Sequence, residues 1–179
     1  MKTKLTSVVI CALAAAVLLL TVADKVSASD ESDVRAAIQR VFDQLTSGQY
    51  DALYDGLPSS FRGRIAKDRF INGLRRTQNM YRLDRIEVGA VHVSGNIAVA
   101  DSTMYGHVTQ PFEADGKIVV QQYLVREDNQ WRVATGDNAT INRFLSANPA
   151  FARRFPIRHP RAFVNQNGKW IEVPLGRRK

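Results

Sequence analysis

The sequence predicts an α+β domain in which three helices precede a curved antiparallel sheet. Three observations lead to this prediction. Apolar residues recur at the spacing of one helix face between residues 34 and 45. Turn signals at Gly95-Asn96, Asp115-Gly116 and Asp128-Asn129 separate four strand-like stretches. No helical stretch interrupts these strands, so we expect antiparallel pairing, with the helices packed on one face of the sheet.

The helices are predicted at residues 33–46, in the stretch GQYDALYDGLP (residues 48–58), and at residues 66–79. The first has five apolar residues on one face, namely Val34, Ile38, Val41, Phe42 and Leu45. The acidic and hydroxyl residues just before it are typical of a helix start, and Gly48 can end it.

The strands are predicted at residues 82–94, 97–108, 117–127 and 130–135. In the first strand the apolar pattern changes phase, because Ile86 and Val88 share one face whereas Val91 and Val93 share the other. A β-bulge at Gly89-Ala90 would place all four on the same side and bend the sheet.

The N-terminus is predicted to be a signal peptide, residues 1–28. It has basic residues at Lys2 and Lys4, an apolar run from Ser7 to Ala23, and the small-residue cleavage site Val26-Ser27-Ala28. Cleavage would give a secreted or periplasmic protein, and an uncleaved segment would anchor the chain in a membrane. The only cysteine, Cys11, lies in this segment, so a cleaved chain would contain neither disulfides nor thiolate sites.

The positive charge is concentrated at the C-terminus. Residues 29–137, the predicted α+β domain, contain 13 Lys and Arg against 15 Asp and Glu. Residues 138–179 contain 9 Lys and Arg against the single acid Glu172, a net charge of +8. We interpret this basic extension as a β-hairpin with its turn at Asn167-Gly168, docked on the domain through Phe163 and Trp170. The alternative is an arm that contacts an anionic envelope surface; nucleic acid does not suit a secreted chain.

The stretches VRAAIQRVFDQLTSGQYDAL, DRFINGL and YLVREDNQWRV, within residues 31–137, resemble the nuclear transport factor 2-like (SnoaL-like) superfamily. This resemblance implies a cone, in which the helices close over the concave face of the sheet and leave a cavity. In that superfamily the cavity serves ketosteroid isomerisation, polyketide cyclisation, dehydration or epoxide hydrolysis. Many secreted members only bind or pack, and no common motif identifies catalytic positions.

Asp101, Thr103, Tyr105 and His107 occupy alternate positions of one predicted strand and therefore share a face. They are either the lining of a ligand cavity or the solvated side of the sheet. In a cavity, Asp101 would act as a base, with Tyr105 or His107 donating a hydrogen bond to a developing oxyanion. Ile97 and Val99 share the polar face, so composition does not decide which face is buried.

No cofactor or metal is expected. His92, His107 and His159 have no ligand spacing, and the chain has no phosphate-binding loop or nucleophile elbow. We expect a secreted, non-catalytic domain that binds a small apolar ligand or a partner protein. One alternative is a cavity enzyme, an isomerase, dehydratase or cyclase using Asp101 and Tyr105. The other is an envelope-associated interaction protein that uses its basic extension, and a homodimer is compatible with each.

Overall fold

The computed structural model describes residues 28–110 and 113–175. The predicted signal peptide lies outside these residues except for Ala28, which begins the first helix. None of the helices in these two ranges has the length and apolar character needed to cross a membrane. The elements follow in this order: α2 (Ala28–Thr46), α3 (Tyr50–Asp55), α4 (Ser59–Arg62), α5 (Lys67–Thr77), β1 (Tyr81–Ser94), β2 (Ile97–Val108), β3 (Ala114–Glu127), β4 (Gln130–Val133), α6 (Asn138–Ala147), α7 (Pro149–Arg154), β5 (Arg161–Gln166) and β6 (Lys169–Val173).

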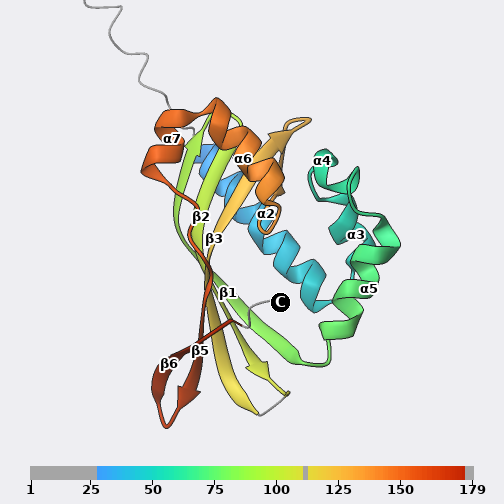
Figure 1. Cartoon of the computed structure of the whole chain (residues 1–179), viewed down its shortest axis with the longest axis vertical. Helices are drawn as coiled ribbons and strands as arrows, with labels where there is room; N and C mark the ends of the chain where they lie inside the picture. Colours follow the sequence, from blue (N-terminus) through green and yellow to red (C-terminus); the bar gives the residue numbers. More distant parts are fainter. Residues whose placement is uncertain (1–27, 111–112, 176–179) are drawn as a thin grey trace, which may run out of the picture.

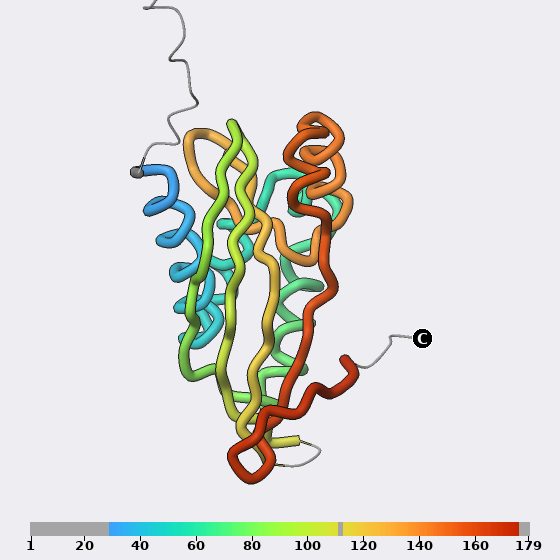
Figure 2. Tube along the Cα trace, turned by 90° about the vertical axis from the view of Figure 1, so that its left-hand side faces the viewer, coloured from blue at the N-terminus to red at the C-terminus, as the bar shows by residue number. Residues whose placement is uncertain are grey.

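The strands form one antiparallel sheet in the order β1-β2-β3-β5-β6. The short strand β4 pairs with one end of β3, and β5 pairs with the other end. Figure 1 shows the long, curved strands with α2 to α5 on one side, and Figure 2 shows the same strands lying next to one another. The predicted α+β fold with a curved antiparallel sheet and a C-terminal hairpin is therefore confirmed.

The face of the sheet toward α2 is called the inner face. Its core joins the helix stripe to the strands: Val34, Ala37, Ile38, Val91, Ala98, Ala100, Leu124, Trp131 and Val133. The predicted bulge is confirmed, because the pairing of β1 with β2 shifts register between Val88 and Val91. Arg35 of α2 donates hydrogen bonds to the carbonyl oxygens of Val88 (2.6 Å) and Gly89 (2.7 Å), which fixes the bulge against the helix.

The opposite, outer face is covered at one end by α6 and α7, which the sequence analysis did not predict. The outer core contains Ile97, Val99, Tyr123, Val125, Ala134, Ile141, Leu145 and Phe151. Residues 138–154 thus form a second helical layer, and β5 extends the sheet. Both parts of the basic extension, the helices α6 and α7 and the hairpin β5–β6, therefore contribute to the fold.

Three further details differ from prediction. The short helix α4 was not expected, and β3 begins at Ala114, so that Asp115-Gly116 lies inside the strand and not in a loop. Gly116 pairs with Gly106 across the sheet. Trp170, expected to dock on the domain, contacts the Tyr105 ring and Lys117 but remains 39% exposed, whereas Val164 is the buried residue of the hairpin.

Candidate functional site

The four polar residues of β2 lie on the outer face, away from the N-terminal helices. Ala98 and Ala100, one residue out of phase, belong to the inner core, whereas Val99 belongs to the outer core. Since side chains alternate along a strand, Asp101 and Tyr105 point outward with Val99. Of the two alternatives that the sequence left open, the structure favours the one in which these four residues do not face the N-terminal helices.

Each of three predicted site residues has its own polar partner. Asp101 forms an ion pair with Arg158. The Tyr105 hydroxyl donates to Glu87 Oε2 at 3.1 Å. His107 Nδ1 lies 3.1 Å from Asp115 Oδ1.

Asp101 and Tyr105 are also far apart along the strand. Four residues separate their Cα atoms by about 13 Å in an extended strand. The Tyr105 ring is covered by the Arg85 guanidinium, whose central carbon lies 3.6 Å from the ring centroid. The two residues suggested as an acid-base pair thus belong to separate local arrangements.

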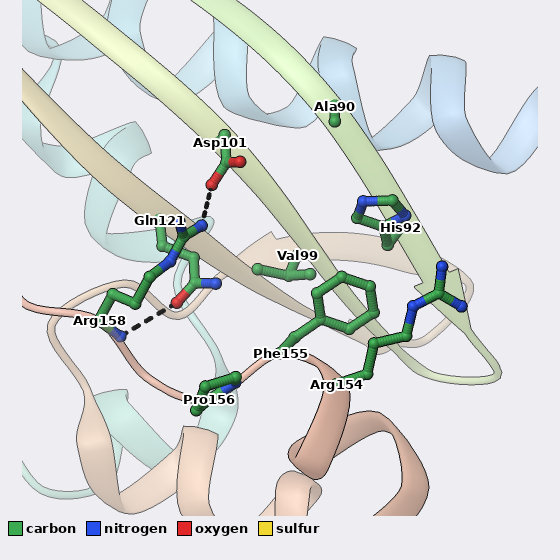
Figure 3. Close-up of a pocket in the computed structure, with 9 residues that line it drawn as sticks. All are labelled: Ala90, His92, Val99, Asp101, Gln121, Arg154, Phe155, Pro156 and Arg158. Atoms are coloured by element: carbon green, nitrogen blue, oxygen red, sulfur yellow. Dashed lines mark hydrogen bonds and ion pairs between the residues drawn. The ribbon is translucent and has the colours of Figure 1, made fainter.

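One cavity lies on the outer face, where residues 154–158 cross the sheet (Figure 3). We call it the outer cavity. Its volume is about 290 Å³, and it is lined by Ala90, His92, Val99, Asp101, Gln121, Arg154, Phe155, Pro156 and Arg158. Of the predicted site residues, only Asp101 lines it.

Side chains from three strands form one wall of the outer cavity. The His92 ring stacks on Phe155 with a centroid distance of 4.4 Å and an interplanar angle of 25°. Buried Gln121 accepts a hydrogen bond on Oε1 from the Arg158 backbone nitrogen at 3.2 Å. These contacts fix the crossing segment at both ends of the cavity.

Tyr123 anchors the same segment from within the core. Its hydroxyl donates to the Phe155 carbonyl oxygen at 2.7 Å. Burial raises the pKa of the Tyr123 phenol, and nearby Arg158 opposes this effect. Because the phenol stays protonated at neutral pH, it remains a hydrogen-bond donor.

The second cavity, which we call the inner groove, lies on the inner face beyond the end of α2. Its volume is about 310 Å³. The lining is mostly apolar: Leu45, Tyr81, Leu83, Met104, Val108, Ile118, Ala162, Phe163, Val164, Val173 and Leu175. His107, Lys117 and Arg82 also line it. Of the four polar residues of β2, only His107 borders this groove, and its side chain points to the outer face with those of Asp101 and Tyr105.

The wall of the groove that β1 forms depends on an irregular, close pairing of β1 with β2. The pairing shifts register between Leu83 and Arg85. At the same place, a Cβ on Gly106 would lie 2.3 Å from the Arg82 carbonyl oxygen. The absence of a side chain at Gly106 therefore allows β1 to approach and form a wall of the groove.

Sequence reasoning missed most of the residues that line the two cavities. Arg154, Arg158 and Gln121 come together only through the crossing of residues 154–158 over the sheet. The signal for the inner groove was weak but present, since Met104 and Val108 continue the apolar face of β2 beyond the part that α2 covers. Within the described ranges, no group of three or more His, Cys, Asp or Glu is placed to hold a metal ion.

Comparison with known proteins gives no family assignment. No protein-family model matches the chain. No curated protein matches its sequence.

Among solved structures, the chain is similar to a Nostoc punctiforme domain of unknown function with a cystatin-like fold. They share 15% identity with a TM-score of 0.43, over 72% of this chain and 92% of that one. A Mycobacterium tuberculosis protein of unknown function has 14% identity and a TM-score of 0.39, over 60% of this chain and 72% of that one.

Proposed function

We propose that this protein is a non-catalytic binding domain that holds a small apolar ligand in the inner groove. The observation that supports this most directly is the lining of the groove, in which aliphatic and aromatic side chains predominate. Soluble proteins rarely leave a contiguous apolar concavity open unless something occupies it. In line with the N-terminal segment, we propose that binding takes place in a secreted or periplasmic setting.

The size of the groove favours a small molecule. A volume of about 310 Å³ lies at the lower end of the usual range for small-molecule sites, roughly 300–1,000 Å³. Strands β1, β2, β3, β5 and β6 and the end of α2 all contribute to its walls, so a ligand would be enclosed from several sides. A flat partner surface would not reach the floor at Met104 and Ile118, whereas a compact apolar molecule would.

The enzyme alternative has less support. Asp101 and Tyr105, the residues on which it depends, lie on the other face and are engaged with Arg158 and Glu87. His107, Lys117 and Arg82 also border the inner groove, but alternation places their side chains on the outer face. His107 is close to Asp115, which points to a structural contact at the rim.

The experiment is titration with N-phenylnaphthylamine, a neutral fluorophore that brightens in apolar surroundings. Ala162→Phe places a ring in the groove, because Ala162 lies opposite Ile118 and Val173. The matched control is Val119→Phe, which adds the same side chain to the outer face, where Val119 is already exposed. We expect saturable binding of one probe per chain, at least tenfold weaker binding for Ala162→Phe, and unchanged binding for Val119→Phe.

Two results would overturn the proposal. One is the absence of saturable binding by the unmodified chain. The other is equal weakening by both variants, which would locate the probe outside the groove. Circular dichroism melting of both variants establishes beforehand that each is folded.

A further inference from the structure

We propose that the outer cavity is a second binding site, one that takes a small organic carboxylate with an apolar body. It does not depend on the inner groove, since the two cavities lie on opposite faces of the sheet. Three features of the outer cavity support this: a cation without an acidic partner, an amide donor, and an apolar floor.

The cation is Arg154, at the end of α7. The other guanidinium at the cavity, that of Arg158, is already paired with Asp101. No carboxylate in the described part of the chain lies within ion-pair distance of Arg154, although Glu31 lines a neighbouring cavity with it. Its guanidinium carbon is 5.3 Å from the Phe155 ring centroid. Arg154 thus gives the cavity one unneutralised positive charge.

The amide donor is Gln121, whose side chain comes from β3 beneath the crossing segment. Gln121 is only 7% exposed. Its Oε1 is used by the Arg158 backbone nitrogen, and no described residue accepts a hydrogen bond from its Nε2. Figure 3 shows this nitrogen directed into the cavity, toward Val99. Because this nitrogen has no acceptor among the described residues, it can donate a hydrogen bond to a molecule bound in the cavity.

The apolar floor determines the rest of the ligand. Val99 is buried, and Phe155 and Pro156 lie beside it between the two arginines (Figure 3). These carbon surfaces would contact an apolar body, while the carboxylate would accept from Arg154 and from Gln121 Nε2.

The charge balance favours a monoanion over phosphate. One free guanidinium matches one negative charge, because the Asp101 carboxylate already neutralises Arg158 in the same cavity. A carboxylate also presents two oxygens in a plane, which suits the fork of donors on arginine. A volume of about 290 Å³ accommodates a molecule of the size of benzoate.

The test uses benzoate as the probe, with benzamide as its neutral counterpart and inorganic phosphate as the competing anion. Binding to the full chain is followed by calorimetry and by the NMR signals of the His92 ring, which lines the cavity. The key variant is Arg154→Gln. Its matched control is Arg143→Gln, because Arg143 lies over the neighbouring Phe144 ring at 5.1 Å, much as Arg154 lies over Phe155, but does not line the cavity.

We expect benzoate to bind saturably and to shift the His92 signals, benzamide to bind at least tenfold more weakly, and phosphate not to displace benzoate. Arg154→Gln should weaken benzoate binding at least tenfold, whereas Arg143→Gln should leave it unchanged. Equal weakening by both variants, binding of benzamide as tight as that of benzoate, or preferential binding of phosphate would each overturn the proposal. Ala162→Phe, which blocks the inner groove, should leave benzoate binding intact.

Discussion

Two aspartates, each paired with an arginine, show how burial determines what a carboxylate contributes. Asp101 pairs with Arg158 on the surface, and its side chain is 53% exposed. Asp137 pairs with Arg64 at 2.5 Å, and its side chain is only 7% exposed. Asp137 also precedes α6, where it accepts hydrogen bonds from the backbone nitrogen (3.3 Å) and hydroxyl (2.5 Å) of Thr140. Asp137 is therefore a buried helix cap, whereas Asp101 is one half of a solvated ion pair.

We predict that Asp101→Ala and Asp137→Ala differ clearly in stability. Exposed ion pairs contribute roughly 0–1 kcal/mol, so Asp101→Ala should cost less than about 1 kcal/mol. Loss of a cap together with buried hydrogen bonds should cost roughly 1–3 kcal/mol for Asp137→Ala. Urea unfolding of the two variants checks this difference. A loss for Asp101→Ala as large as that for Asp137→Ala would mean that the Asp101 pair is shielded from water.

The sequence could not show which face of the sheet the Asp101 side chain lies on. Ile97 and Val99 on one face of the strand and Ala98 and Ala100 on the other are all buried, because helices cover both faces at that end of the sheet. Alternation identifies the buried face only where a sheet has one solvated side. The polar residues begin where the outer helices end, which depends on tertiary packing and not on the strand itself.

Among the elements, β1 and its bulge were the best predicted. The apolar pattern changes phase between Val88 and Val91, and an extra residue in the strand brings all the apolar side chains to one face at little cost in free energy. The register shift of the pairing lies at this place. The helices α4, α6 and α7 were not predicted, because their sequences carry little signal of their own. They contain 4, 10 and 6 residues, and helices so short owe their stability to packing more than to their own sequence.

Two glycines are predicted to respond to alanine with opposite signs. A Cβ at Gly106 would meet the Arg82 carbonyl oxygen at 2.3 Å, so Gly106→Ala should force β1 away and cost roughly 1–3 kcal/mol. Gly73 lies within α5, and no atom lies within 4 Å of the position its Cβ would take. Gly73→Ala should therefore stabilise by about 0.5–1 kcal/mol.

Urea unfolding measures both effects, and Gly106→Ala should also weaken binding in the inner groove, since Gly106 and Arg82 line it. If Gly106→Ala were as stable as the unmodified chain, the close approach of β1 to β2 would be incorrect. Gly73→Ala, which lies far from the groove lining, should leave the binding of the fluorophore unchanged.

For the whole molecule, the basic extension is part of the fold. Strand β5 pairs with β3 across more than 40 residues of sequence, from Gly116 with Val164 to Val119 with Arg161. Local patterns revealed the hairpin but not the strand it joins, because such long-range pairing leaves no local signature. Its turn is the predicted one, with Asn167 and Gly168 at positive φ. The charge asymmetry of the sequence thus marks a structural segment whose arginines mostly reach solvent.

Two truncations separate the contributions of this segment. Deleting residues 138–179 removes Ile141, Leu145 and Phe151 from the outer core, at roughly 1.5–3 kcal/mol for each buried side chain. With the hairpin also lost, the summed loss of stability approaches the whole free energy of unfolding of a typical domain, about 5–15 kcal/mol. This chain should therefore aggregate or fail to fold. Deleting only residues 161–179 keeps the outer core and removes the Ala162, Val164 and Val173 wall of the inner groove.

The shorter deletion should therefore melt cooperatively but earlier, and it should no longer bind the fluorophore. It should still bind benzoate, because every residue that lines the outer cavity precedes residue 159. Size-exclusion chromatography and circular dichroism melting compare the two truncated chains with the full chain. A chain without residues 138–179 that melts like the full one would show that the extension is an appended arm, and the assignment of α6, α7 and the hairpin to the core would then be wrong.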